Sequence, residues 1–434
     1  MVLHPDVKSR PRAERTRAPE RALEEAVGLA RAIELDVFEA LVVPLPKPDP
    51  GRLFGAGKVE ELRILLEEAR VELVVIDGPV TPVQQRELER AWKVKILDRT
   101  GLILEIFGER AATREGVLQV ELAALRYART RLVRSWTHLE RQRGGLGFVG
   151  GPGETQIEAD RRAIQERIER IEKRLEGVTR TRELHRAARA KVPYPVVALV
   201  GYTNAGKSTL FNRLTRAGVM AEDMLFATLD PTMREIRLPS GRKAILSDTV
   251  GFVSDLPTML VAAFRATLEE VLAADVIVHV RDMSHPDAET QAADVAQVLA
   301  ELGVEESRRE AMIEARNKID LMEGEARAAL LNETARRDDA VAVSALTGEG
   351  GEALLALIEA KLTEGATTRR LLAPHTEGAA VAWLHEHAEV LASRATEAGQ
   401  EIEARLLPED LARFRRRFPE VAVGEPAPER RAAQ

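Results

Sequence analysis

The feature that most constrains this chain is the octapeptide GYTNAGKS at residues 201–208, which has the spacing G-x-x-x-x-G-K-S. It follows the apolar run VVALV at residues 196–200, and the residues after it are suited to the first turns of a helix. In a strand–loop–helix unit of this kind, backbone N–H groups surround a polyphosphate and the helix N-terminus adds positive potential. The pattern therefore predicts a phosphate-binding loop inside an α/β domain.

Further residues complete a predicted triphosphate and magnesium site. Lys207 can reach the β- and γ-phosphates, and the Ser208 hydroxyl can bind Mg²⁺. Asp248 ends the apolar run in the segment ILSDTVG, and a carboxylate at a strand end holds the metal, usually through water. Gly251 then lets a backbone N–H approach the γ-phosphate closely.

The tetrapeptide NKID at residues 317–320 is expected to select the base. A carboxylate at Asp320 can accept hydrogen bonds from N1–H and the N2 amine of guanine. Adenine has neither donor, so the same carboxylate would be desolvated and unpaired, which costs several kcal/mol. The tetrapeptide therefore favours GTP over ATP. Residues 344–346, which follow an apolar run, are expected to supply the backbone N–H that reads guanine O6.

The segment FATLDPT at residues 226–232 is expected to form a loop that responds to the nucleotide. A threonine here can close on Mg²⁺ and the γ-phosphate and then release on hydrolysis. We expect this threonine to be Thr228, with Thr232 as the alternative. Phe252 stands directly after Gly251, where a glutamine often orients the attacking water. Because phenylalanine has no donor or acceptor, we expect slow intrinsic turnover that a partner accelerates.

These motifs define a predicted site with GTP as substrate and Mg²⁺ as cofactor. We expect Lys207, Thr228 and Gly251 to act in catalysis, and Ser208, Thr228 and Asp248 to hold the metal. The predicted nucleotide-binding residues are Gly201, Tyr202, Thr203, Asn204, Ala205, Gly206, Lys207, Ser208, Thr209, Phe226, Ala227, Thr228, Leu229, Asp230, Asp248, Thr249, Val250, Gly251, Asn317, Lys318, Ile319, Asp320, Ser344, Ala345 and Leu346.

The rest of the chain predicts an α/β protein of several domains. Residues 26–113 alternate short apolar runs with helical patterns, as a small α/β domain does. Residues 114–192 contain two apolar seams of coiled-coil spacing, which predict an antiparallel hairpin of long helices. The glycine-rich residues 144–153 between the seams are interpreted as a mobile tip, with a passive linker as the alternative.

The GTP-binding domain is expected to span residues 193–365. Residues 366–418 have room for a small α+β module, with a helix at 380–391 and a strand at 401–406. The arginine-rich residues 1–25 are interpreted as a disordered basic tail. Residues 419–434, rich in Pro, Glu, Arg and Ala, are also expected to be disordered.

Charge is distributed unevenly along the chain. The formal net charge is −7, yet residues 126–191 hold 17 Lys or Arg against 9 Asp or Glu. A basic segment within an acidic protein suggests a local contact with a polyanion. The chain has no cysteine, which excludes disulfides and thiol catalysis. No stretch approaches the ~20 apolar residues that span a bilayer, so we expect no integral membrane contact.

Four of these motifs together resemble the HflX-type GTPases of the translation-factor-related P-loop class. They are GPGETQ at 151–156, GYTNAGKS at 201–208, FATLDPT at 226–232 and DTVGF at 248–252. The resemblance implies a factor that binds the large (50S) ribosomal subunit and splits or rescues stalled ribosomes under stress. We also expect the protein to be cytoplasmic and monomeric. It also implies ribosome-stimulated hydrolysis and rRNA contact through residues 126–191, with the glycine-rich tip directed toward the peptidyl-transferase region.

Two other functions are compatible with the residues. One is a GTPase of ribosome assembly or tRNA maturation that binds RNA without splitting ribosomes. The other is a coiled-coil interaction scaffold in which the GTP site has only a structural role.

Overall fold

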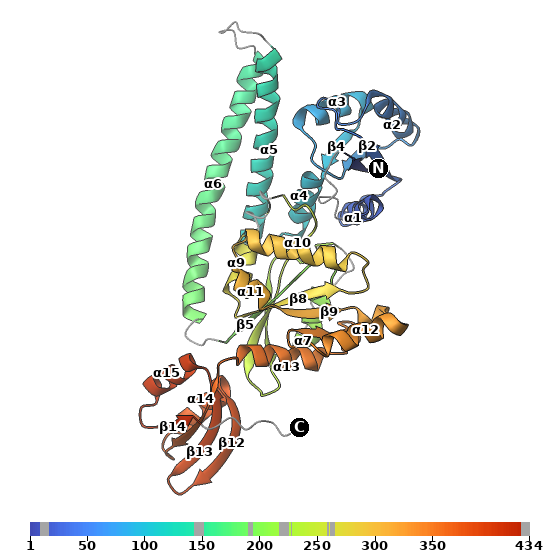
Figure 1. The fold of residues 1–434 in the computed structure, drawn as a ribbon. Helices are drawn as coiled ribbons and strands as arrows, with labels where there is room; N and C mark the ends of the chain where they lie inside the picture. The colour runs from blue at the N-terminus through green and yellow to red at the C-terminus, as the bar shows by residue number, and fades with distance from the viewer. Residues whose placement is uncertain are drawn as a thin grey trace.

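The computed structural model describes residues 1–8, 17–142, 152–189, 194–216, 225–226, 228–257, 260 and 265–426. Its strands form three sheets, which lie in an N-terminal domain, in the predicted GTP-binding domain (called here the GTPase domain) and in a C-terminal module (Figure 1). A pair of long helices connects the first domain to the second. This arrangement confirms the predicted fold class.

The N-terminal domain is a parallel four-stranded sheet with the order β2-β1-β3-β4. Its core includes Phe54, Leu66 and Trp92, which cluster with the smaller apolar residues of the strands. The strands are β1 (Val2–Val7), β2 (Ala40–Leu45), β3 (Leu73–Ile76) and β4 (Lys95–Asp98), and the helices are α1 (Pro19–Arg31), α2 (Ala56–Glu68), α3 (Pro82–Trp92) and α4 (Arg99–Arg110).

The predicted disordered tail at residues 1–25 is wrong for most of its described part. Strand β1 pairs with both β2 and β3, so it is an interior strand of the sheet. Val2 and Leu3 are buried, and the apolar start of the chain outweighs the arginines that follow. Helix α1 begins at Pro19, seven residues before the predicted start of the domain at residue 26. Of the five arginines in residues 1–25, Arg17 and Arg21 lie within the described residues, whereas Arg10, Arg12 and Arg15 lie outside them.

The predicted hairpin consists of α5 (Arg114–Gln142) and α6 (Pro152–Arg189), which run side by side (Figure 1). The buried seam between them contains Leu118, Leu122, Ile168 and Ile171, as the coiled-coil spacing predicts. Arg126 pairs with Glu172, which fits an antiparallel arrangement. The predicted tip lies outside the described residues, except for Pro152 and Gly153 in the first turn of α6. Proline is suited to the first turn of a helix, because the N–H that it lacks would have no partner there.

The GTPase domain is built on a six-stranded sheet with the order β10-β9-β8-β5-β7-β6, in which only the edge strand β6 is antiparallel. The strands are β5 (Val196–Gly201), β6 (Thr232–Arg237), β7 (Lys243–Asp248), β8 (Val276–Asp282), β9 (Ile313–Asn317) and β10 (Ala340–Ala342). The helical elements are α7 (Lys207–Thr215), α9 (Arg265–Ala273), α10 (Ala288–Glu301), α11 (Glu306–Glu310), the 3-10 turn η2 (Ile319–Leu321), α12 (Gly324–Thr334) and α13 (Gly351–Leu362).

The C-terminal module has an antiparallel sheet with the order β12-β13-β11-β14. Trp383, Phe414 and Phe418 pack together over this sheet and form much of its core. Its elements are β11 (Thr367–Ala373), α14 (Gly378–His387), β12 (Glu389–Thr396), β13 (Gly399–Leu406), α15 (Pro408–Arg417) and β14 (Ala422–Pro426).

Two predictions for this region are wrong. The helix predicted at 380–391 ends at His387, because the residues from Glu389 onward pair with β13. The tail predicted to be disordered from residue 419 contains β14, which pairs with β11 and buries Val421 against the aromatic core. In both places tertiary pairing overrides the local composition.

A shared apolar core joins the N-terminal domain, the base of the hairpin and the GTPase domain. It includes Leu29 of α1, Phe107 of α4 and Ala123 of α5 together with Leu199 of β5. Phe107 also contacts Phe226 edge to face, with 4.7 Å between ring centroids. Among the described helices, none is long and apolar enough to cross a membrane.

Candidate nucleotide and magnesium site

The phosphate loop lies between β5 and α7, at the carboxyl edge of the GTPase sheet. Gly206 has φ +93°, and a Cβ there would lie 2.3 Å from Asn317 Nδ2. At Gly201 a Cβ would lie 2.2 Å from the carbonyl oxygen of Val280. Both positions therefore require glycine, because each has a positive φ and each is closely approached, Gly201 by the Val280 carbonyl and Gly206 by the Asn317 side chain.

Lys207 is buried beneath this loop. Its ammonium donates to the backbone carbonyls of Gly201 at 3.1 Å and Tyr202 at 2.8 Å. Burial lowers the pKa of Lys207 to about 8, although Asp248 partly opposes the shift. The charged form of such a buried ammonium is stabilised by a nearby anion, and a nucleotide phosphate would be such an anion.

Three oxygen-bearing side chains converge beside Lys207. Ser208 Oγ donates to Asp248 Oδ2 at 2.7 Å, and Thr228 Oγ1 lies 2.9 Å from Ser208 Oγ and 3.1 Å from Asp248 Oδ2. Thr232 starts β6 and is opposite Asp248 in the strand pairing, and the structure records no such contact for it. Of the two candidate threonines, Thr228 is therefore the one whose hydroxyl joins the set.

The converging oxygens suit Mg²⁺. Asp248 is completely buried, and burial raises the pKa of its carboxyl group. Its Oδ1 atom has no hydrogen-bond partner within the part of the chain that the structure describes. Two hydroxyls and a carboxylate are hard oxygen ligands of the kind that Mg²⁺ prefers. Across the described ranges, no group of three or more His, Cys, Asp or Glu side chains could hold a metal ion.

The end of the site that is expected to read the base is held together by Asn317. Its Nδ2 donates to the carbonyl of Ala205 at 2.7 Å, and its Oδ1 accepts from the N–H of Ala345 at 2.9 Å. Asn317 thus connects the phosphate loop to the loop at residues 344–346. Asp320 Oδ1 accepts from Ser344 Oγ at 2.6 Å, which orients the carboxylate predicted to recognise guanine.

Lys318 adopts φ +65° and its ammonium lies 2.8 Å from Asp282 of β8. Ile319 is fully buried, whereas the Leu346 side chain is 67% exposed. The polar residues before Asn317 also find partners, because Arg316 is buried against Glu314 at 3.1 Å. The strand β9 therefore packs normally despite its charges.

The backbone at Gly251 is close to both the phosphate loop and the lysine. A Cβ there would lie 2.8 Å from Thr203 Cα and 2.9 Å from Lys207 Nζ. The next residue, Phe252, is only 1% exposed and pairs its backbone with Gly201 and Thr203. Its side chain is part of the core, consistent with the expectation that it does not orient water.

The other predicted residues differ in their burial and contacts. Asn204 is exposed, with φ +58°, while Thr203, Val250 and Leu229 are buried around the loop. Thr249 Oγ1 donates to the carbonyl of Leu199 at 2.6 Å. Thr209 continues α7. Ala227 lies outside the described residues.

Three predicted site residues direct their side chains toward the N-terminal half instead. Phe226 packs on Phe107, and the Tyr202 hydroxyl receives a hydrogen bond from Arg17 at 2.8 Å. Asp230 accepts from the N–H of Ala112 at 2.9 Å, close to the first turn of α5. These residues can contribute to nucleotide binding only through their backbone.

Several residues that contact the site's loops were missed by the sequence reasoning. They are Glu25 and Arg99 of the N-terminal domain and Ser254 after the DTVGF segment. No motif marks Glu25 or Arg99, because their partners are far away in the sequence. Arg99 stands between the polar residues Asp98 and Thr100, so its charge does not mark it either.

Known proteins match most of this chain. Family models match residues 20–108 (GTP-binding GTPase N-terminal), 110–189 (GTP-binding GTPase middle region), 196–318 (50S ribosome-binding GTPase) and 329–426 (HflX C-terminal domain). GTPase HflX of Magnetococcus marinus is 50% identical over 397 residues, which cover 92% of this chain and 90% of that protein. GTPase HflX of Escherichia coli is 42% identical, with 82% of each chain covered.

Among solved structures, a GTP-binding protein from Sulfolobus solfataricus in complex with GDP is 23% identical. It matches 84% of this chain and 98% of that one, with a TM-score of 0.44. The two sequence relatives are far more similar, and each match covers 82% or more of both proteins. From these relatives and the phosphate-loop domain, it follows that the chain belongs to the HflX family of GTPases and is a GTP-hydrolysing enzyme.

Proposed function

We propose that this GTPase binds the large ribosomal subunit and uses GTP binding and hydrolysis to split or rescue stalled ribosomes. The ribosome stimulates its hydrolysis, and the protein acts as a monomer in the cytoplasm. The observation that supports this proposal is a basic helical hairpin projecting from a GTPase domain (Figure 1). The match of that domain to the 50S ribosome-binding GTPase model supports the same partner.

The hairpin offers its charge to solvent in a form that suits rRNA phosphates. On α6, arginines alternate with the buried seam residues and are exposed, among them Arg161, Arg162, Arg167 and Arg174. Arginine forms bidentate hydrogen bonds with phosphate, and neutralising phosphates releases counterions. Affinity for the ribosome should therefore fall steeply as the salt concentration rises.

Within the GTPase domain, we propose that Ser208, Thr228 and Asp248 hold Mg²⁺ and that Lys207 binds the β- and γ-phosphates. The bound Mg²⁺ would neutralise charge that develops on the phosphates. Asp320 would accept hydrogen bonds from guanine, and the Gly251 N–H would approach the γ-phosphate. Support comes from the convergence of the three oxygens, from the buried ammonium of Lys207 and from Asp248 Oδ1, which has no hydrogen-bond partner among the described residues.

Co-sedimentation with 30S, 50S and 70S particles, in the presence of GDP or a non-hydrolysable GTP analogue, tests the proposal. We expect 50S and 70S binding that is stronger with the analogue, faster hydrolysis with these particles, and a loss of light scattering as 70S particles split. Arg161→Gln together with Arg162→Gln should weaken binding. Arg86→Gln together with Arg90→Gln, on the exposed face of α3, removes equal charge and should not weaken binding.

Two results would contradict the proposal. Equal binding with GDP and with the analogue would rule out nucleotide control. Binding to 50S precursors without any effect on 70S particles would favour the assembly function instead.

A further inference from the structure

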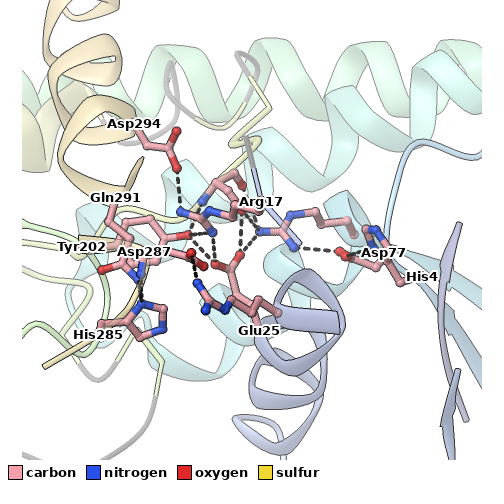
Figure 2. Close-up of polar contacts among 12 residues, drawn as sticks. His4, Arg17, Glu25, Asp77, Tyr202, His285, Asp287, Gln291 and Asp294 are labelled. Atoms are coloured by element: carbon pink, nitrogen blue, oxygen red, sulfur yellow. Dashed lines mark hydrogen bonds and ion pairs between the residues drawn. The ribbon is translucent and has the colours of Figure 1, made fainter. Parts of the chain in front are cut away.

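A buried polar network joins the N-terminal domain to two loops of the GTPase site (Figure 2). Its centre is the carboxylate of Glu25 on α1, which faces Arg17 and Tyr202. Glu25 accepts a hydrogen bond from Arg17 at 2.7 Å and from Ser254 Oγ at 2.8 Å. It also accepts from Arg99 and from the hydroxyl of Tyr202. One carboxylate of the N-terminal domain thus holds a residue of the phosphate loop and a residue of the segment after DTVGF.

Ser254 is held through all of its polar groups. Its backbone N–H donates to the Tyr202 hydroxyl at 2.6 Å, and its hydroxyl donates to Glu25. Its carbonyl oxygen accepts from Arg99 at 2.9 Å. A loop residue with its N–H, side chain and carbonyl all engaged has little freedom to shift relative to the N-terminal domain.

This constraint acts only three residues away from Gly251. Between them, the N–H of Phe252 donates to the carbonyl of Gly201 at 3.1 Å, and the N–H of Thr203 donates to the carbonyl of Phe252 at 2.7 Å. The phosphate loop and the DTVGF segment are therefore bonded directly to each other, and Glu25 additionally holds both against the N-terminal domain. The position of the Gly251 N–H depends on both restraints.

The network is anchored firmly on its other side. Arg99, the first residue of α4, is buried and donates to Asp77 at 2.7 Å. Asp77 in turn lies 2.8 Å from His4 of the central strand β1. Burial opposes the ionisation of Glu25, but Arg99 and Arg17 outweigh it, so the pKa of Glu25 lies below its usual value. The carboxylate therefore stays charged and bound to both arginines.

Apolar packing already joins the two domains, through the shared core and the contact of Phe107 with Phe226. A buried ionic network adds little net stability compared with apolar packing, since desolvation of the charges offsets their attraction. What such a network does provide is a defined geometry for the groups that it holds. Here those groups belong to the two loops nearest the predicted γ-phosphate position.

We propose that Glu25 is a positioning residue for GTP hydrolysis, acting through Tyr202 and Ser254 to fix the backbone at Gly251. The Phe252 side chain lies in the core and cannot help to position the reacting groups. The N-terminal domain thereby supplies part of this positioning. GDP lacks the γ-phosphate, so its binding does not depend on the Gly251 N–H. The network should accordingly affect the hydrolysis step and leave GDP affinity unchanged.

The test uses the full chain and three substitutions, Tyr202→Phe, Ser254→Ala and Glu25→Ala. Single-turnover GTP hydrolysis is measured together with GDP affinity by calorimetry. We expect hydrolysis to slow by about ten- to a hundredfold, because small displacements of reacting groups reduce rates by factors of this size. GDP affinity should stay within the error of the wild-type value. Combining Tyr202→Phe with Ser254→Ala should slow hydrolysis by less than the product of the single effects, because both act through one network.

Asp294→Ala is the matched control. Asp294 pairs with the same Arg17 at 2.8 Å but is bonded to neither loop, so this variant should hydrolyse GTP at the wild-type rate. Tyr202→Phe removes a single oxygen and keeps the test informative even if Glu25→Ala fails to fold. Wild-type hydrolysis in Tyr202→Phe and Ser254→Ala would overturn the proposal. A parallel loss of GDP affinity and hydrolysis would overturn it too, since that result indicates a purely structural role.

Discussion

Replacement of Asn317 by alanine should weaken nucleotide binding by disconnecting two loops of the site. Asn317 is 1% exposed, and each end of its amide is bonded to the backbone of a different loop. One bond, of 2.7 Å, reaches the carbonyl of Ala205 in the phosphate loop, and the other, of 2.9 Å, comes from the N–H of Ala345. Alanine would leave both backbone groups without these partners.

The magnitude follows from those two bonds. A buried hydrogen bond contributes about 1 kcal/mol net, so losing two costs about 2 kcal/mol. In Asn317→Ala, nucleotide binding has to bring the two loops into the arrangement that the amide holds in the wild type. The loss then corresponds to roughly thirtyfold weaker nucleotide binding. Because the amide is bonded to Ala205 and Ala345 and not to Gly251, where the γ-phosphate is expected, the affinities for GDP and for the GTP analogue should fall by the same factor.

Calorimetric titration with GDP and with a GTP analogue measures the effect. Asn317→Asp keeps the acceptor for Ala345 but places an oxygen against the Ala205 carbonyl, so it should bind no better than Asn317→Ala. Asn332→Ala on exposed α12 removes the same group elsewhere and should bind normally. Wild-type affinity in Asn317→Ala would refute the idea that the amide couples the two loops.

Three further outcomes can be checked. Thr228→Val should weaken the Mg²⁺ dependence of GTP-analogue binding while Thr232→Val leaves it unchanged, because only Thr228 lies beside Ser208 and Asp248; the reverse order in a magnesium titration would point to Thr232. Asp230→Ala should slow hydrolysis less than Thr228→Val does, and add little to it in the double variant, because Asp230 anchors the same loop to the base of α5; additive effects would mean that Asp230 acts independently. Burial, with a contribution from Arg281, lowers the pKa of His279 to about 4, so the unfolded chain binds the proton first as pH falls. The free energy of unfolding should therefore drop by about 2 kcal/mol more in the wild type than in His279→Gln between about pH 7.5 and about pH 5, and equal pH dependence would refute the assignment.

The hairpin and the strands of the GTPase domain were predictable because their signals are local. The regularly spaced apolar residues, among them Leu118, Leu122, Ile168 and Ile171, form the observed seam. A helix places residues with this spacing on one face whatever surrounds it. The phosphate-loop motif likewise prescribes its own strand, turn and helix. Errors arose where local composition and tertiary pairing disagree. Strand β1 and strand β14 both come from segments whose charge suggested disorder, and each is stabilised by neighbours distant in sequence.

By itself, the sequence determined that this chain has a guanine-nucleotide domain, a basic helical hairpin and two smaller domains, because contiguous motifs and periodic apolar residues specify local structure. Only the tertiary structure placed Thr228, in preference to Thr232, beside Ser208 and Asp248, and only it brought Glu25 and Arg99 to Tyr202 and Ser254. Contacts between residues more than a hundred and fifty positions apart depend on how sheets and helices pack. No spacing within a single segment carries that information.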